Sequence, residues 1–221
     1  MGRWAWSISH QEFTIADHYY FWRLQRLLTD HGIPCVPVER FDDLFGYDGI
    51  VFNYPERPFT PAERDRLLTY VEQGGVVLAL AYYLNEDHVA EILNVLLAPA
   101  GIRFRYDAVT DPASNYEGDP YMVVTTRVYR YASGVTHLML ACPCSVEILH
   151  ADVVPVVQAE STARSTASLQ DSICLAAERS LGRGRILAVG SCVFWDNFSI
   201  DVLDNGRWAL ALLQSAGSGE K

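Results

Sequence analysis

The stretch YDGIVFNYPERPFTPAERDRLLTYVEQGGVVLALAYYL, residues 47–84, decides the predicted fold of this 221-residue chain. It contains two short runs of apolar residues, 49–52 and 76–81. Continuous apolar runs of this length are typical of strands that are covered on both faces of a parallel sheet. The stretch therefore predicts two neighbouring buried strands.

A helix is predicted between these two strands. Thr60 is a good N-cap residue, Pro61 suits the first turn, and Glu63 completes a capping box. Gly74 and Gly75 provide the end signal of the helix. A strand, a helix and a strand in this order form the unit from which parallel sheets are built.

The same alternation continues outward in both directions along the chain. Alternating strands and helices imply parallel strands, right-handed crossovers and helices on both faces of the sheet. We therefore predict an α/β fold of the flavodoxin-like, doubly wound type with a mostly parallel sheet. Its further elements are strands over residues 4–9, 34–38, 102–106 and 185–189, and helices over 15–31, from Asn85 or Glu86 to Gly101, and after Asp204-Asn205.

The second half of the chain changes character and predicts a strand-rich extension of the same domain. We expect one domain over residues 1–215 and a flexible tail over 216–221. Residues 107–120 are rich in turn formers and predict a long surface loop, and the polar residues 159–171 predict a mobile loop. Short strands are expected within residues 121–131, 135–140, 146–149 and 153–158, whereas 172–181 fits a strand or a short helix.

Composition excludes some classes of function. The formal net charge of −10 argues against binding to nucleic acid, which needs a basic face. An odd number of cysteines, five, in a chain of this size favours reduced thiols and a cytoplasmic location. The longest apolar run, residues 76–84, is too short to span a bilayer, and the first residues lack a signal-peptide core.

Several motifs resemble those of the class I glutamine amidotransferase-like superfamily. YDGIVFNYP and VEQGGVVLALA are similar to its core strands, and GRGRILAVGSCVFWDN followed by DNGRWALALL resembles the ending of its non-catalytic branch. SHQEF, after the first strand, resembles a polar loop of that branch. The branch includes domains of the intraflagellar transport protein 52 group and of gliding-motility transport proteins. The resemblance implies a non-catalytic domain.

The chain departs from the catalytic members where their chemistry is carried out. The resemblance would place a nucleophilic cysteine after the strand over residues 76–81, but Ala81, Tyr82 and Tyr83 stand there. The late loop has Ser191-Cys192 where the catalytic members have a histidine and a glutamate. A nucleophile needs a base within hydrogen-bond reach. We therefore expect no ammonia release from glutamine.

A ligand site is expected at the carboxyl ends of the parallel strands, where open α/β sheets bind their ligands. Aromatic, amide and carboxylate side chains gather there, and this mixture suits a small polar ligand or a carbohydrate. Loops at this edge are also polar and aromatic in proteins that bind nothing there. The candidate ligand-binding residues are His10, Glu12, Asn53, Tyr54, Tyr82, Tyr83, Asn85, Asp87, Trp195, Asp196 and Asn197.

Three functions remain open from the sequence. The first is a scaffold or ligand-binding module, with a protein partner or a second copy of the chain. The second is a divergent hydrolase or transferase in which His10 activates Cys192, although Cys192 also fits a buried thiol beneath Trp195. The third is carbohydrate binding of the trehalose-utilisation type. Neither a metal nor a cofactor is expected, because no ligand spacing or phosphate-binding loop occurs.

Overall fold

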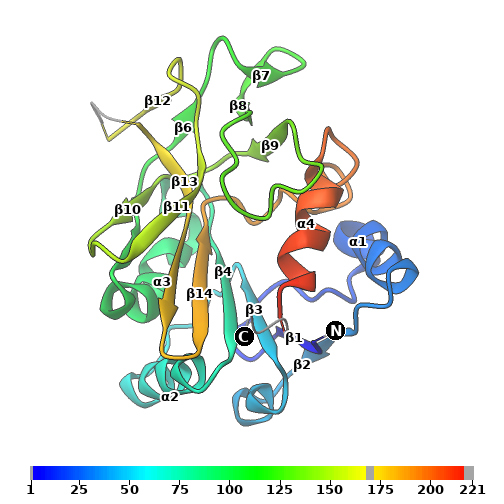
Figure 1. Cartoon of the computed structure of the whole chain (residues 1–221), viewed down its shortest axis with the longest axis vertical. Helices are drawn as coiled ribbons and strands as arrows, with labels where there is room; N and C mark the ends of the chain where they lie inside the picture. Colours follow the sequence, from blue (N-terminus) through cyan, green and yellow to red (C-terminus); the bar gives the residue numbers. More distant parts are fainter. Residues whose placement is uncertain (1, 168–171, 217–221) are drawn as a thin grey trace.

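The computed structural model describes residues 2–167 and 172–216. Its centre is a seven-stranded sheet with the order β11-β13-β14-β4-β3-β1-β2 (Figure 1). Five neighbouring strands of this sheet are parallel to one another, β13 is antiparallel to β14, and β11 is antiparallel to β13. The strands are β1 (Trp4–Ser7), β2 (Cys35–Val38), β3 (Gly49–Asn53), β4 (Val76–Leu80), β11 (Val153–Gln158), β13 (Cys174–Leu181) and β14 (Gly184–Val189). A mixed α/β fold with a large, mostly parallel sheet is thus confirmed.

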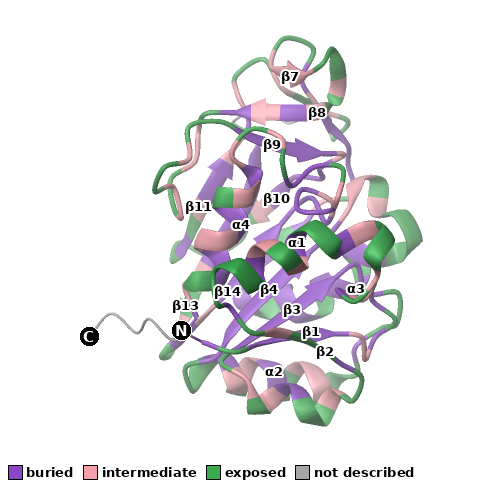
Figure 2. Ribbon diagram, turned by 90° about the vertical axis from the view of Figure 1, so that its right-hand side faces the viewer, coloured by how far each residue is buried: buried purple, intermediate pink, exposed green. Residues whose placement is uncertain are grey.

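In the described part of the chain, four α-helices cover the sheet. Helices α1 (His18–Asp30) and α4 (Asn205–Gln214) contact each other on one side, and α2 (Pro61–Glu72) and α3 (Val89–Leu97) contact each other on the other (Figure 1). Burial is concentrated in the sheet between these two layers, while the outer helix faces are exposed (Figure 2). Every residue of β1, β3 and β4 is buried, which was predicted from the apolar runs of β3 and β4.

The predicted start of α2 is confirmed in detail. Thr60 Oγ1 accepts a hydrogen bond from the N–H of Glu63, and the Thr60 N–H donates to Glu63 Oε2 at 2.8 Å. Both halves of the capping box are therefore present. This fixes the entry into α2 directly after the loop that leaves β3.

The amino ends of the parallel strands are packed backbone against backbone. A Cβ atom on Gly184, the first residue of β14, would lie 2.1 Å from the Val71 oxygen and 2.2 Å from the Gly75 oxygen. A Cβ on Gly49, at the start of β3, would lie 2.4 Å from the Trp4 ring. Glycine is therefore required at these positions by space.

The second half of the chain forms small sheets beyond the carboxyl ends of β4 and β14 (Figure 1). Hydrogen bonds tie this extension to the main sheet: Cys144 N–H donates to the Gly190 oxygen, and Leu84 N–H donates to the Asp107 oxygen. The small sheets pair β5 (Ile102–Phe104) with β10 (Val146–Ile148), β6 (Val109–Thr110) with β12 (Arg164–Ser165), and β7 (Asn115–Tyr116) and β9 (Leu138–Ala141) with β8 (Asp119–Thr125).

Two helix starts were predicted too early. Helix α1 begins at His18, because the Asp17 side chain accepts a hydrogen bond from the Tyr19 N–H and caps it. Helix α3 begins at Val89 rather than at Asn85 or Glu86. The intervening 3₁₀ segment η2 (Tyr83–His88) contains residues with left-handed backbone, so a regular helix cannot form there.

Three predictions for irregular segments were wrong in part. Residues 107–120 contain β6 and β7 and are anchored by the buried carboxylates of Asp107 and Asp111. Residues 159–171 contain β12, and 168–171 lie outside the described residues. Ala216 is buried, and its oxygen accepts a hydrogen bond from the Gly2 N–H, so the predicted tail does not begin there. Residues 217–221 lie outside the described part.

Each edge of the main sheet carries a proline. Pro37 lies in β2 and Pro155 lies in β11. Two further 3₁₀ turns, η1 (Phe41–Gly46) and η3 (Ala98–Ala100), join the larger elements.

Candidate functional site

A pocket of about 250 Å³ lies at the carboxyl ends of the parallel strands, where a ligand site was expected. It is formed by the loops that follow β1, β3, β4 and β14, together with α1. Its lining residues are Phe13, Tyr20, Phe21, Asn53, Tyr54, Tyr82, Glu86, Cys192, Val193 and Asp196.

The part of the pocket lining at the end of β3 is polar and buried. Asn53 ends the strand, and its Oδ1 accepts a hydrogen bond of 3.1 Å from Trp195 Nε1. Tyr54 takes a left-handed backbone (φ 62°), and its hydroxyl donates to Asp87 Oδ2 at 2.8 Å. Burial is the main cause that raises the pKa of Tyr54. The Tyr54 hydroxyl is therefore held neutral at the edge of the pocket.

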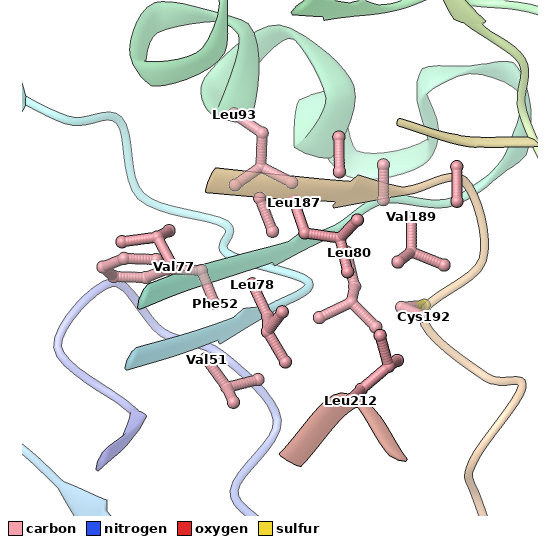
Figure 3. Close-up of a cluster of buried hydrophobic side chains, with 14 of the residues drawn as sticks. Val51, Phe52, Val77, Leu78, Leu80, Leu93, Leu187, Val189, Cys192 and Leu212 are labelled. Atoms are coloured by element: carbon pink, nitrogen blue, oxygen red, sulfur yellow. The ribbon is translucent and has the colours of Figure 1, made fainter. Parts of the chain in front are cut away.

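The loop after β14 supplies Asp196 and Cys192. Asp196 Oδ1 accepts hydrogen bonds of 2.9 Å from the N–H groups of Phe198 and Ser199, and burial raises the pKa of this carboxyl. Cys192 is 3% exposed, and burial raises its pKa well above the ordinary value. Figure 3 draws Cys192 within the same cluster of buried hydrophobic side chains as Val189 and Leu80.

Tyr82, from the loop after β4, forms a wall of the pocket. Its ring lies 6.0 Å from that of Tyr54 and 4.7 Å from that of Tyr83. Burial raises the pKa of Tyr82, and the neighbouring Cys142 side chain raises it further. Glu86, from the same loop, adds an exposed carboxylate to the lining.

The sequence prediction missed the contribution of Phe13 and of α1. Phe13, Tyr20 and Phe21 line the pocket, and none of them is among the candidate ligand-binding residues predicted from the sequence. Phe13 follows the polar loop after β1, and its ring lies 5.3 Å from that of Tyr54. An aromatic residue just beyond a polar loop at this edge was the available signal.

His10 and Glu12 do not line the pocket. The buried His10 ring stacks 4.1 Å from Phe59, and its Nε2 lies 3.6 Å from Glu63 Oε2, at the start of α2. Burial is the largest cause that lowers the pKa of His10. No hydrogen bond or ion pair joins His10 to Cys192 in the described part of the chain. The structure therefore does not bring this predicted nucleophile and base together.

Glu12 belongs to the same buried polar group as His10. Its Oε2 accepts a hydrogen bond of 2.7 Å from the His10 N–H, while Oε1 is buried without a hydrogen-bond partner. Burial raises the pKa of this carboxyl. The loop after β1 packs against Phe59 and Glu63 at the start of α2, and His10 and Glu12 are thereby held away from the pocket.

Other candidates support the pocket without lining it. Trp195 packs against Trp6, with ring centroids 5.1 Å apart, and Asn85 Oδ1 accepts the N–H of Glu91. Asn197 fastens α1, because its Nδ2 donates to main-chain oxygens of that helix. Tyr83 contacts Tyr121 outside the pocket, at 6.0 Å between ring centroids.

Asn205 holds the loop that carries Asp196, a role that sequence reasoning missed. Its Nδ2 donates to the oxygens of Met139, Phe194 and Ser199, and its Oδ1 accepts the N–H of Met139. All four bonds are buried. Asp204 does not cap α4 with its side chain, because its carboxylate accepts N–H groups from the chain before β9.

Other hollows are larger but differ in character. A groove of about 470 Å³ runs between α1 and the edge strand β2, and its walls are mostly apolar. Another of about 420 Å³ lies beside the start of α2, where Arg66 pairs with Asp42. Neither lies at the carboxyl ends of the central strands.

Two further properties concern the described residues. Within residues 2–167 and 172–216, no group of three or more His, Cys, Asp or Glu side chains could hold a metal ion. No helix in that part of the chain is both long and apolar enough to cross a membrane.

The fold resembles solved structures over nearly the whole chain. The mmIFT52 N-terminal domain superposes with a TM-score of 0.82 at 19% identity, covering 98% of each chain. A ThuA-like protein from Bacteroides uniformis gives a TM-score of 0.57 at 14% identity, covering 98% of this chain and 93% of that one. At these identities the similarity shows the fold alone.

Sequence comparison identifies the family. An uncharacterized protein of Aquifex aeolicus (strain VF5) is 39% identical over 217 residues, which cover 95% of this chain and 92% of the relative. The model of one protein family matches residues 23–213. The chain therefore belongs to the family described as Domain of unknown function (DUF4350).

Proposed function

We propose that this chain is a non-catalytic, amidotransferase-like module that binds a small polar ligand in the pocket at the carboxyl ends of β3, β4 and β14. The strand order β2-β1-β3-β4-β14 and the helices on both faces support a flavodoxin-like, doubly wound arrangement. The similarity to the mmIFT52 N-terminal domain supports the non-catalytic branch.

The observation that carries this proposal is the combination of polar and aromatic groups in the pocket. Asn53, Tyr54 and Asp196 are at most 6% exposed and yet line the pocket. Burying polar groups costs free energy, which a protein tolerates where these groups serve a site. A few placed polar groups among aromatic rings are typical of ligand pockets.

The chemistry of Cys192 favours binding over catalysis. A nucleophilic cysteine needs a lowered pKa and an adjacent base. Burial raises the pKa of Cys192, with the Asp196 carboxylate as the next cause, and His10 lies beside Glu63 instead. Cys192 therefore acts as a buried wall of the pocket in this proposal.

The test is thermal unfolding in the presence of a library of small polar compounds. A compound that binds the folded state raises the unfolding temperature, and Val193→Trp, which fills the pocket from its lining, should abolish the rise. Should Val193→Trp fail to fold, Asp196→Asn serves as the second variant. Selective modification of Cys192 by a thiol reagent at neutral pH, with turnover of any compound, would contradict the proposal.

A second candidate function is contact with another protein chain, which an aromatic rim at the pocket favours. The rim is a row of aromatic side chains across the pocket in which the centroids of neighbouring rings lie 4.7–6.0 Å apart. Its outer members Tyr19 and Phe198 are 67% and 64% exposed. Aromatic residues are enriched in protein interfaces. The series runs Phe198, Tyr19, Tyr20, Phe13, Tyr54, Tyr82, Tyr83 and Tyr121.

Sedimentation over a wide range of protein concentration tests this second candidate with a second copy of the chain as the partner. The wild type should dimerise, and the double variant Tyr19→Ser, Phe198→Ser should remain monomeric. A wild type that is monomeric at every concentration would refute self-association through the rim.

A further inference from the structure

The lining of the pocket is aromatic and acidic. Five rings contribute to it, those of Phe13, Tyr20, Phe21, Tyr54 and Tyr82. Two carboxylates, those of Asp196 and Glu86, stand among them, and the lining described above contains no Arg, Lys or His. The whole chain carries a net charge of −10, so the pocket lies in an acidic protein.

The rings meet at inclined angles. Phe13 and Tyr20 are tilted by 58°, Phe13 and Tyr54 by 51°, and Tyr54 and Tyr82 by 66°. None of these three pairs is stacked face to face. An aromatic face carries negative charge density, so aromatic rings that line a small cavity attract a cation.

The charged groups of the lining point to the same kind of ligand. The Tyr54 proton is donated to Asp87 Oδ2 and is therefore not available to a ligand. Asn53 Oδ1 is occupied by Trp195 Nε1, which leaves the Asn53 amide N–H groups as donors. The charged groups of the lining are acceptors, so an anionic ligand would meet repulsion without a compensating cation.

We propose that the pocket binds a small organic ammonium, that is, a protonated or quaternary amine. This inference rests on the proposed function of the pocket and names the chemical class of its ligand. The aromatic rings surround the cationic head group, and Asp196 and Glu86 neutralise its charge. A volume of about 250 Å³ fits a small molecule of this class.

Isothermal titration calorimetry with choline tests the proposal directly. The comparison probe is the uncharged tert-butyl analogue of choline, in which carbon replaces the nitrogen, so that shape is kept and charge is lost. Choline should bind about tenfold more tightly than the analogue, as expected for a desolvated cation–π site. Glucose, trehalose and inorganic phosphate serve as neutral and anionic probes.

Variants assign the binding to this pocket. Tyr82→Leu and Asp196→Asn should each weaken choline binding by about tenfold, because each removes one source of attraction. Tyr106→Leu, at a tyrosine 53% exposed and outside the lining, should leave binding unchanged. Circular dichroism of each variant establishes that it is folded.

The outcomes separate this inference from the function on which it rests. Equal affinity for choline and its neutral analogue overturns the ammonium proposal. Binding of a sugar or of phosphate, lost in Val193→Trp, also overturns it but leaves a ligand-binding module. A folded protein that binds none of the probes, and that no compound of the library stabilises, overturns both.

Discussion

At the two ends of the parallel sheet, left-handed backbone conformation occurs at different types of residue. At the amino ends, left-handed conformation falls on glycines such as Gly74 and Gly182. At the carboxyl ends, it falls on side-chain-bearing residues, among them Tyr54, Leu84 and Cys142. A residue other than glycine in this conformation costs free energy of order 1–3 kcal/mol unless its surroundings fix it.

This difference separates the part of the sheet that is built for packing from the part that is built around the pocket. Glycine at the amino ends lets main chains touch, as Gly184 does with Val71 and Gly75. Left-handed residues at the carboxyl ends place side chains such as Tyr54 at the pocket. Strained residues of this kind cluster at binding and catalytic sites in proteins.

The largest effect is expected at the amino ends. Gly184→Ala places a Cβ atom 2.1 Å from a main-chain oxygen that cannot move away as a flexible side chain would. We expect a loss of about 3–4 kcal/mol in the free energy of unfolding, measured in urea. Gly46→Ala is the matched control, because no atom lies within 4 Å of its added Cβ, and it should be nearly neutral.

The second largest effect is expected at Asn205, which holds the loop after β14 at the carboxyl ends of the strands. Asn205→Ala removes four buried hydrogen bonds and should cost about 2–3 kcal/mol in urea unfolding. Asn85→Ala, which removes the single bond to the Glu91 N–H, should cost about 1 kcal/mol. Equal losses in the two variants would show that Asn205 is no special anchor of the pocket loop.

A smaller effect of opposite sign is expected at a strained position. Leu84 is 54% exposed and has φ 54°, so Leu84→Gly relieves strain while removing little buried surface. The free energy of unfolding should rise by about 0.5–1 kcal/mol. Val95→Gly, at an exposed position inside α3, should instead lose about 1 kcal/mol. A destabilised Leu84→Gly would mean that the strain is absent.

The last prediction concerns the dependence of stability on pH. Burial raises the pKa of Glu12 above its ordinary value of 4.5, so the folded protein holds this proton more tightly than the unfolded chain. The stability contributed by the neutral carboxyl is present below pH 4.5 and is lost as the pH rises through the raised pKa. Glu12→Gln should therefore gain stability relative to the wild type as the pH rises.

Asp204 provides the control, because its carboxyl group should change stability with pH in the opposite direction to that of Glu12. Hydrogen bonds from the N–H groups of Thr136 and His137 lower the pKa of Asp204, so its stabilising effect is present above its ordinary value of 3.8 and is lost as the pH falls. Asp204→Asn should therefore lose stability relative to the wild type as the pH rises. Urea unfolding measured across the acid range gives both slopes, and slopes of equal sign would contradict the assignments.

Local sequence rules predicted the regular part of the fold. The apolar runs of β3 and β4 and the capping box of α2 are signals that neighbouring residues determine by themselves. The start of α3 was predicted too early because Asn85 is a good N-cap residue and Glu86 suits the first turn of a helix. Their backbone is set instead by tertiary contacts such as the bond from Leu84 N–H to Asp107.

The candidate site was predicted in outline only. The rule for parallel sheets located the edge and selected Asn53, Tyr54, Tyr82 and Asp196, which line the pocket. The rule says nothing about which way a loop turns, and the packing of the first loop against the start of α2 removed His10 from the site. Helix α1 contributes Tyr20 and Phe21 to the pocket lining. Which of its residues face the pocket depends on how the helix packs on the sheet, and hydrophobic periodicity alone does not predict this.

The prolines of the two edge strands restrict how this protein can associate with others. Pro37 in β2 and Pro155 in β11 each lack an N–H group. The outer side of β11 also bonds this chain's own residues, because the Val156 oxygen accepts the Tyr129 N–H and the Gln158 N–H donates to the Arg127 oxygen. Both ends of the hydrogen-bonded ladder are thereby protected against strand-by-strand growth, the route by which exposed edges lead to fibrils. Addition of a further strand to the main sheet is therefore disfavoured at both of its edges.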